Sequence, residues 1–222
     1  MRSGQATADA LGVNDTAFLA FATKPTPDAM HANLYTSGVN GYEQRSVLSF
    51  TGSAQLSVDI DQQDVIIPYT DGIDVFSHPL QRYLQIDNEL MKVVSMTTTN
   101  ITVERAVLDT IPATHSIGAR IYFNGQGGGS DGETYQYNET ASVKLLTVTA
   151  LGMLDEASAP ISSATLNNRR HLRPYPPGYV RINNLLYPLS VSDLDDITVT
   201  WRSKSRLQLT TATLYSWFNT SS

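Results

Sequence analysis

The sequence contains no cysteine. This absence excludes disulfide bonds, thiol nucleophiles and thiolate metal sites, and it leaves the redox compartment undetermined. No apolar run approaches the roughly 18 residues that a transmembrane helix needs, and residues 1–24 lack the continuous apolar region of a secretion signal. We therefore expect neither a membrane span nor a signal peptide.

Charged side chains are also scarce. Asp, Glu, Lys and Arg make up 16% of the 222 residues, against roughly 25% in an average soluble domain. The net charge of −6 gives the chain as a whole no field that attracts nucleic acid or an anionic membrane surface. So little charge suits either a surface buried against partners or an ordinary β protein, and composition leaves both open.

Catalytic motifs are missing as well. The sequence has no Gly-x-Ser-x-Gly nucleophile elbow and no His-Glu-x-x-His zinc motif, and its four histidines are scattered singly. The glycine-rich residues 125–133 lack the Gly-Lys-Ser/Thr ending of a phosphate-binding loop. We expect no enzymatic activity, no cofactor and no metal.

Three aspartates, Asp59, Asp61 and Asp64, lie close together and raise the question of a calcium loop. An EF-hand loop needs glycine at its sixth position and glutamate at its twelfth, where this chain has Asp64 and Thr70. The mismatch favours a solvated strand end and leaves a calcium site of another type open.

What the sequence has in quantity is short runs of alternating apolar and polar residues. In residues 196–204, Ile197, Val199 and Trp201 fall on one face and polar residues on the other, as in a half-buried antiparallel strand. Similar runs occupy residues 89–96, 100–105, 119–123 and 142–151. The sequence therefore predicts an all-β protein.

Two stretches are typical of boundaries between modules. Residues 124–133 hold five glycines and are expected to form a flexible linker rather than the interior of an element. Pro174, Pro176 and Pro177 favour a stiff, extended connector.

Cations and aromatic rings interleave around these prolines, in the order Arg169, Arg170, His171, Arg173, Tyr175, Tyr179 and Arg181. Such interleaving also occurs in nucleic-acid patches. Because the chain is acidic overall and the prolines demand extended backbone, we expect these side chains to pack along neighbouring domains instead of binding nucleic acid.

Residues 84–123 carry a pattern that resembles a known module. The pattern is a D-x-E strand start, a strand ending in Glu-Arg, a loop Thr-x-x-x-x-His-x-x-Gly and a last apolar strand, here with Glu104, Arg105, Thr110, His115 and Gly118. It is similar to a small β-barrel of tail-tip, hub and baseplate proteins in long-tailed bacteriophages (siphophages) and gene transfer agents. Where the family pattern has glycines, this chain has Ala106 and Asp109.

A second block resembles a junction in the same proteins, where an Arg-Pro-x-x-Pro segment leads into a fibronectin type III strand. The residues that fall on this pattern are Arg173, Pro174, Pro176, Pro177, Asp196, Ile197, Val199, Trp201, Lys204 and Arg206. Lys204 stands where arginine is more usual. The two blocks occur in the family's order and together cover residues 84–209, somewhat over half of the chain.

The resemblance implies several small β modules joined by Gly- and Pro-rich linkers. We expect a β-rich region of unknown type in residues 1–80 and a small barrel in residues 81–124. Residues 125–178 are expected to hold the Gly-rich linker, strands and the Pro-rich connector. Residues 179–222 are expected to form a partial fibronectin type III-like or immunoglobulin-like sandwich, because they supply about half of the roughly 100 residues that a sandwich needs.

The implied role is that of a structural virion protein in a phage tail tip or baseplate, as a hub or hub-associated component. Such a protein is assembled in the host bacterial cytoplasm, contacts tail tube, hub and fibre proteins, and supports host attachment, with any contact to a host receptor being indirect. A homo-oligomer is expected, a trimer among the options. The family's hubs are usually longer, so the chain is expected to be a fragment or a separately encoded piece.

Within the first motif, His115 has no nucleophile or metal partner near it in the sequence. We interpret Arg105 and His115 as pins that hold the long loop onto the barrel, with Gly118 supplying the turn before the last strand. Replacing His115 by alanine is expected to cost roughly 1–3 kcal/mol of stability.

Two alternatives stay open. The first is a receptor-binding or carbohydrate-binding β module of a tail fibre or adhesin, in which exposed Tyr35, Tyr42 and Tyr69 stack on sugar rings. The second is a tail enzyme that cleaves glycans or peptides.

Overall fold

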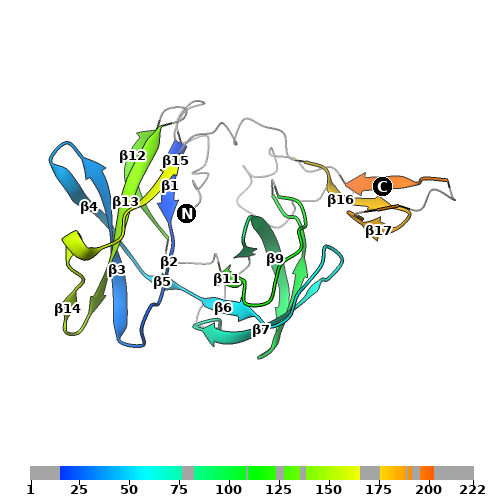
Figure 1. Ribbon diagram of the computed structural model, residues 1–222, viewed down its shortest axis with the longest axis horizontal. Helices are drawn as coiled ribbons and strands as arrows, with labels where there is room; N and C mark the ends of the chain where they lie inside the picture. Colours follow the sequence, from blue (N-terminus) through cyan, green and yellow to red (C-terminus); the bar gives the residue numbers. More distant parts are fainter. Residues whose placement is uncertain are drawn as a thin grey trace. The chain divides into compact units, whose positions relative to one another are not determined.

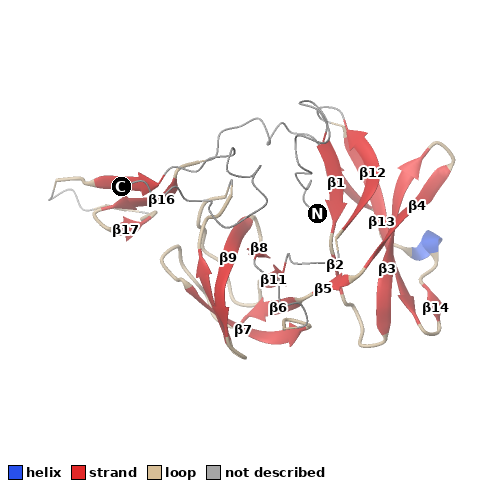
Figure 2. Cartoon of the chain, turned by 180° about the vertical axis from the view of Figure 1, so that it is seen from behind, coloured by secondary structure: helices blue, strands red, loops and turns tan. Residues whose placement is uncertain are grey.

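The computed structural model describes residues 16–76, 83–108, 110–123, 128–135, 139–165, 176–188, 190–191 and 196–202. Within these residues every regular element is a β-strand except one 3-10 turn, η1, at Glu156–Ser158 (Figures 1 and 2). The predicted all-β fold class is confirmed. The chain divides into two units: Met1–Gly52 with Asn124–Arg173, and Ser53–Phe123 with Pro174–Ser222.

The first unit is built on an antiparallel sheet with the order β14-β13-β3-β4, in which β15 also pairs with β13. Its strands are β3 (Ala29–Gly38), β4 (Gly41–Leu48), β13 (Thr140–Thr149), β14 (Gly152–Met153) and β15 (Ser162–Thr165). Two further pairs belong to it: β1 (Thr16–Ala20) with β12 (Gly129–Tyr135), and β2 (Ala22–Thr23) with β5 (Phe50–Thr51). The core of this unit includes Ala32 and Leu34 of β3, Leu48 of β4, and Ala141 and Val143 of β13.

The glycine-rich stretch forms part of a strand, which corrects the prediction of a linker. From Gly129 onward these residues form β12, while residues 124–127 lie outside the described chain. A Cβ atom built on Gly129 would come within 2.1 Å of Leu48 Cδ2, and one on Gly128 within 2.7 Å of the Phe21 ring. The glycines are therefore required because β12 starts in close contact with neighbouring side chains.

The second unit contains a closed six-stranded barrel with the order β10-β7-β6-β11-β8-β9. Its strands are β6 (Ser53–Leu56), β7 (Ile66–Ile73), β8 (Tyr83–Ile86), β9 (Glu89–Met96), β10 (Asn100–Glu104) and β11 (Arg120–Phe123). The inward-facing residues of all six strands form one apolar core, which includes Leu56, Ile67, Leu84, Met91, Ile101 and Phe123.

The barrel starts earlier than the predicted limits of 81–124. Strands β8 to β11 alone would leave two open edges, and β6 and β7 close the ring by pairing β11 to β6, β6 to β7 and β7 to β10. Because Ser53 pairs with Tyr122, the chain enters and leaves the barrel at neighbouring positions. The barrel is thus inserted into the sequence of the first unit, and the predicted 125–178 segment supplies β12, β13, β14 and β15 to that unit.

The C-terminal part of the second unit is a three-stranded sheet with the order β17-β16-β18. Its strands are β16 (Gly178–Ile182), β17 (Leu185–Leu186) and β18 (Val199–Arg202). The loop between the first two is Asn183-Asn184, whose φ angles of 50° and 67° suit a tight hairpin turn. Pro176 and Pro177 precede β16, while Arg173, Pro174 and Arg206 lie outside the described residues, as do Arg169, Arg170, His171 and Tyr175.

Candidate functional site: a buried charge network in the barrel

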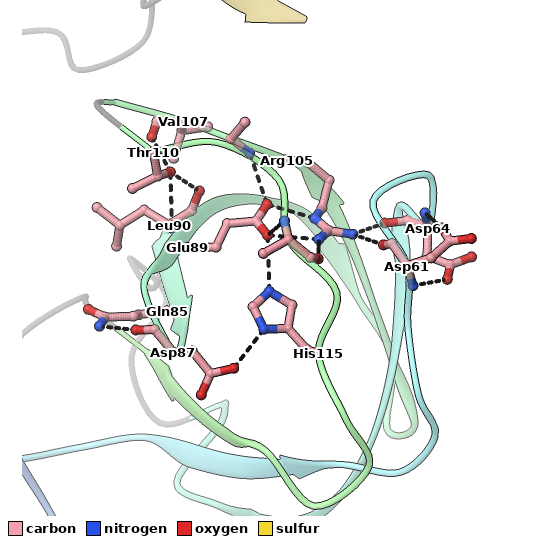
Figure 3. Close-up of polar contacts among 12 residues, drawn as sticks. Asp61, Asp64, Gln85, Asp87, Glu89, Leu90, Arg105, Val107, Thr110 and His115 are labelled. Carbon is pink, nitrogen blue, oxygen red and sulfur yellow. Dashed lines mark hydrogen bonds and ion pairs between the residues drawn. The ribbon is translucent and has the colours of Figure 1, made fainter. Parts of the chain in front are cut away.

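Four charged or titratable side chains meet at one end of the barrel core (Figure 3). Glu89 begins β9, Asp87 lies in the turn before it, Arg105 directly follows β10, and His115 lies in the long loop between β10 and β11. Only 1% of Glu89, 1% of Arg105 and 3% of His115 is exposed. We call these four residues the charge network.

Arg105 uses all five of its N–H donors. Its Nε and Nη2 donate to the two carboxylate oxygens of Glu89, both at 2.7 Å. Its Nη1 donates to the backbone carbonyls of Asp61 and Asp64, at 2.6 and 2.8 Å. Nη2 also donates to the carbonyl of Ala113 at 2.7 Å. One guanidinium thus fixes β9, the 61–64 turn and the long loop together.

Glu89 also accepts hydrogen bonds from two backbone amides and contacts His115. Oε1 accepts the backbone N–H of Ala106 at 3.1 Å, and Oε2 accepts that of Ala113 at 2.9 Å. Oε2 also lies 3.0 Å from Nε2 of His115. With the two bonds from Arg105, the carboxylate is fully surrounded by donors, which is how a buried charge avoids its desolvation penalty.

His115 lies between two carboxylates. Its Nδ1 is 2.8 Å from Oδ2 of Asp87, while its Nε2 faces Glu89. A carboxylate offers only acceptors, so both contacts are hydrogen bonds only when both ring nitrogens carry protons. The geometry therefore selects the imidazolium cation. The backbone of His115 also forms a two-bond bridge with Ile60, at 2.9 and 3.0 Å.

The charges shift two pKa values in opposite directions. Burial alone would lower the pKa of His115, but hydrogen bonds to Glu89 and Asp87 and the charge of Glu89 outweigh burial and raise it above 6.5. Burial alone would raise the pKa of Glu89, but bonds from Arg105 and His115, the charge of Arg105 and the N–H of Ala113 lower it below 4.5.

Two other motif residues complete the loop anchor. Thr110 is buried; its hydroxyl donates to the carbonyl of Val107 at 2.7 Å and accepts the N–H of Leu90 at 3.2 Å. Gly118 has a φ of +81°, a left-handed conformation that favours glycine, so it supplies the turn before β11. Arg105 and His115 have the geometry of the predicted pins.

The remaining motif residues lie elsewhere. Glu104 is partly exposed and pairs with Lys92 at 3.1 Å, outside the charge network. Trp201 lies on β18 with 63% of its surface exposed. The other expected cation and ring on this segment, Arg181 and Tyr179, belong to β16, where the Tyr179 ring faces the Arg202 guanidinium at 4.9 Å.

Glu89 is the last residue of the D-x-E strand start, and the sequence pattern did not predict its central place in the charge network. The available signal was Arg105 itself, because an arginine expected in a barrel core needs a carboxylate partner. Asp87 and Glu89 were the acidic candidates at the start of the facing strand. The backbone acceptors at Asp61, Asp64 and Ala113 carry no signal in the sequence, since any residue type can supply a carbonyl.

The three aspartates of the 59–64 segment bond to backbone amides. Asp61 Oδ1 accepts the N–H of Gln63 at 2.7 Å, Asp64 Oδ2 accepts that of Asp61 at 2.8 Å, and Asp59 Oδ1 accepts that of Ile117 at 2.6 Å. No group of three or more potential metal-ligating side chains gathers in the described ranges. These carboxylates shape the turn that Arg105 binds.

The tyrosines considered for sugar stacking are less exposed than expected. Tyr69 is buried, and its hydroxyl donates to the carbonyl of Thr97 at 2.8 Å. Tyr35 and Tyr42 are half-buried, and Lys144 covers the Tyr42 ring at 4.3 Å. The prediction of an exposed ring is therefore wrong for Tyr69.

A helix able to span a bilayer is absent from the part of the chain that the structure describes. Comparisons of the sequence with protein-family profiles and with curated proteins give no match.

Proposed function

We propose that the protein is a structural component of a bacteriophage tail tip or baseplate, as a hub or hub-associated part. The observation that carries this proposal is the convergence of Arg105, Thr110, His115 and Gly118 on one loop anchor. These are the residues on which the resemblance to the tail-hub barrel rests. Each of these residues fixes part of the loop between β10 and β11, so their spacing in the sequence has a structural reason.

The chemistry of the anchor supports an assembly role. Glu89, Arg105 and His115, the buried members of the charge network, form their hydrogen bonds within the barrel. Their partners are backbone carbonyls, backbone amides and carboxylates of this chain. Such an arrangement fixes loops in one conformation, and a preorganised surface lowers the entropy that association must overcome. A module that docks repeatedly onto other tail proteins needs this rigidity.

The partners that follow are the tail tube, hub and fibre proteins, with a homo-oligomer expected. The site of action is the tail tip of the virion, after assembly in the bacterial cytoplasm. A host-surface receptor would be reached indirectly, through attached fibres.

Labelling of purified virions tests the proposal. Antibodies against the chain should place gold particles at the tail tip, and cryo-electron microscopy should show density for the barrel there. Label confined to the capsid, or absent from virions, would overturn it.

A receptor-binding or carbohydrate-binding module is the second candidate, favoured by the partial exposure of Tyr35 and Tyr42 on neighbouring strands. Binding of the purified chain to a glycan array, lost in the double variant Tyr35→Ala/Tyr42→Ala, would favour it over a purely structural role.

A further inference from the structure

The 61–64 turn of the barrel also contacts the C-terminal sheet of the same unit. The side-chain amide of Gln63 donates to the backbone carbonyl of Leu186 on β17, and its side-chain oxygen accepts the N–H of Leu186 at 2.8 Å. A carboxamide offers N–H donors and a carbonyl acceptor side by side, as a peptide group does. Gln63 therefore pairs with Leu186 as a residue of a neighbouring strand would.

The backbone groups of Leu186 that bind Gln63 point away from their own sheet. β17 is an edge strand, and Leu186 stands opposite Arg181 of β16. The next residue, Tyr187, donates its N–H to the carbonyl of Val180 at 3.0 Å. Because hydrogen-bonded and non-hydrogen-bonded pairs alternate along an antiparallel ladder, the N–H and C=O of Leu186 face outward. Gln63 thus bonds where a further strand would add to the sheet.

The backbone around Gln63 is held in place by two side chains. The guanidinium of Arg105 binds the carbonyls of Asp61 and Asp64, which lie on either side of Gln63 in the turn (Figure 3). The Asp61 carboxylate accepts the N–H of Gln63 at 2.7 Å and that of Asp64 at 3.2 Å. A side chain on a fixed turn loses less conformational entropy on binding than one on a mobile loop. Arg105 and Asp61 therefore present Gln63 to β17 in a defined place.

Two tyrosines of the C-terminal sheet support this placement. Burial raises the pKa of Tyr179, and the charge of Glu104 adds to the rise. Burial also raises the pKa of Tyr187, and the charge of Glu89 contributes in the same direction. Both carboxylates belong to the end of the barrel that holds the charge network, so the C-terminal sheet lies beside that end.

We propose that Gln63 docks the C-terminal sheet onto the barrel by pairing with the edge of β17 as a strand residue would, positioned by the turn that Arg105 and Asp61 hold. The barrel then fixes the orientation of the C-terminal sheet as well as its own loops. The inference goes beyond the proposed tail function and does not depend on it. A C-terminal sheet that moves freely would overturn the inference and leave the tail assignment standing, whereas virions without label would do the reverse.

Electron paramagnetic resonance distances between two spin labels on the full chain test the docking. The chain has no cysteine of its own, so Ser95→Cys on β9 and Thr200→Cys on β18, both at exposed positions, carry the only labels. The labelled parent should give one narrow distance distribution, which Gln63→Ala should lose. Gln62→Ala is the matched control, because it removes the same type of side chain one position earlier, and it should keep the narrow distribution. A broad distribution in the parent, or an unchanged one in Gln63→Ala, would overturn the proposal.

Hydrogen exchange at one amide, followed by nuclear magnetic resonance, supplies the second readout. The N–H of Leu186 should exchange about 10-fold faster in Gln63→Ala, because it loses its acceptor. Asp61→Ala keeps Gln63 but removes the carboxylate that holds its N–H, and it should speed exchange of the same amide. Amides of β9 and β10 should exchange as in the parent, which shows that the barrel is intact. An unchanged Leu186 amide in either variant would overturn the proposal.

Discussion

Glu89 is the residue on which the barrel's polar interior depends. Its side chain is completely buried, and it is the one described carboxylate that contacts both Arg105 and His115. A buried ion pair contributes little compared with a well-packed apolar substitute, but removing one partner leaves the other charge buried without compensation. For this reason, substitution of Glu89 is the most direct test of how much the charge network stabilises the barrel.

Replacing Glu89 by glutamine should lower the free energy of unfolding by about 3–5 kcal/mol, because buried Arg105 loses its carboxylate partner and His115 loses one of its two. Urea denaturation followed by circular dichroism measures the change. The matched control is Glu104→Gln, which breaks the partly exposed pair with Lys92 and should cost at most about 1 kcal/mol. Equal effects of the two variants would mean that the charge network does not stabilise the barrel.

The network also predicts how stability depends on pH. The folded pKa of His115 lies above 6.5, so its contribution is complete below 6.5 and fades as the pH rises through the folded value. The folded pKa of Glu89 lies below 4.5, so its contribution is complete above 4.5 and is lost as the pH falls through the folded value. Stability from these two groups should therefore be greatest between pH 4.5 and 6.5.

Urea denaturation between about pH 5 and about pH 9 checks this dependence on the alkaline side. The parent chain should lose stability as the pH rises, and His115→Gln, which cannot titrate, should be less stable below pH 6.5 and show a flatter profile. His31→Gln removes a histidine outside the barrel and should keep the parent's profile. A parent profile as flat as that of His115→Gln would contradict an imidazolium between Asp87 and Glu89.

At the scale of elements, the loop after β10 is anchored at the expense of backbone strain. Ala106 and Leu108 adopt φ angles of 56° and 59°, the left-handed region that residues with a side chain avoid. The Ala106 N–H donates to Glu89 from this conformation. A glycine at position 106 would adopt this angle without strain.

Ala106→Gly should therefore stabilise the protein by about 0.5–1 kcal/mol, since relief of about 1–2 kcal/mol of strain exceeds the entropy that glycine adds to the unfolded chain. Ala159→Gly is the contrasting control, because Ala159 has an ordinary φ of −71°; it should destabilise by about 0.5–1 kcal/mol. Thermal unfolding of both variants decides the matter, and a loss of stability in Ala106→Gly would contradict the strain.

At the scale of the whole molecule, the barrel is an insertion with its own core. The apolar core, the charge network and all strand pairs of the ring come from residues 53–123. The two ends of this segment are paired through Ser53 and Tyr122. A domain with adjacent ends and a private core can fold separately from its host.

A fragment of residues 53–123 should therefore unfold cooperatively and keep its sensitivity to Glu89→Gln. Joining residue 52 to residue 124 through a short glycine linker should leave the strand content of the first unit intact. A fragment of residues 81–124, which lacks β6 and β7, should stay unfolded. Circular dichroism and thermal melts of the three chains provide the measurement, and a cooperative transition in the 81–124 fragment would show that ring closure is not required.

Local sequence patterns predicted individual strands and the anchored loop. The alternation through Ile197, Val199 and Trp201 indicated β18, and the Arg105 to Gly118 spacing indicated an anchored loop. The limits of the barrel could not be predicted from local patterns, because the ring closes by pairing β6 with β11, the first and last strands of the barrel in the sequence. The glycines at 128 and 129 were misread as a linker because their reason lies in Phe21 and Leu48, distant in sequence.

The sequence by itself determined the all-β character, the absence of thiol chemistry and the residues able to anchor the loop, because strand periodicity and side-chain chemistry are local properties. Only the tertiary structure decided that Glu89 is the centre of the charge network and that the barrel interrupts the first unit. Each of these depends on which distant segments pair, and pairing follows from closing strand edges and burying both faces of a sheet at once.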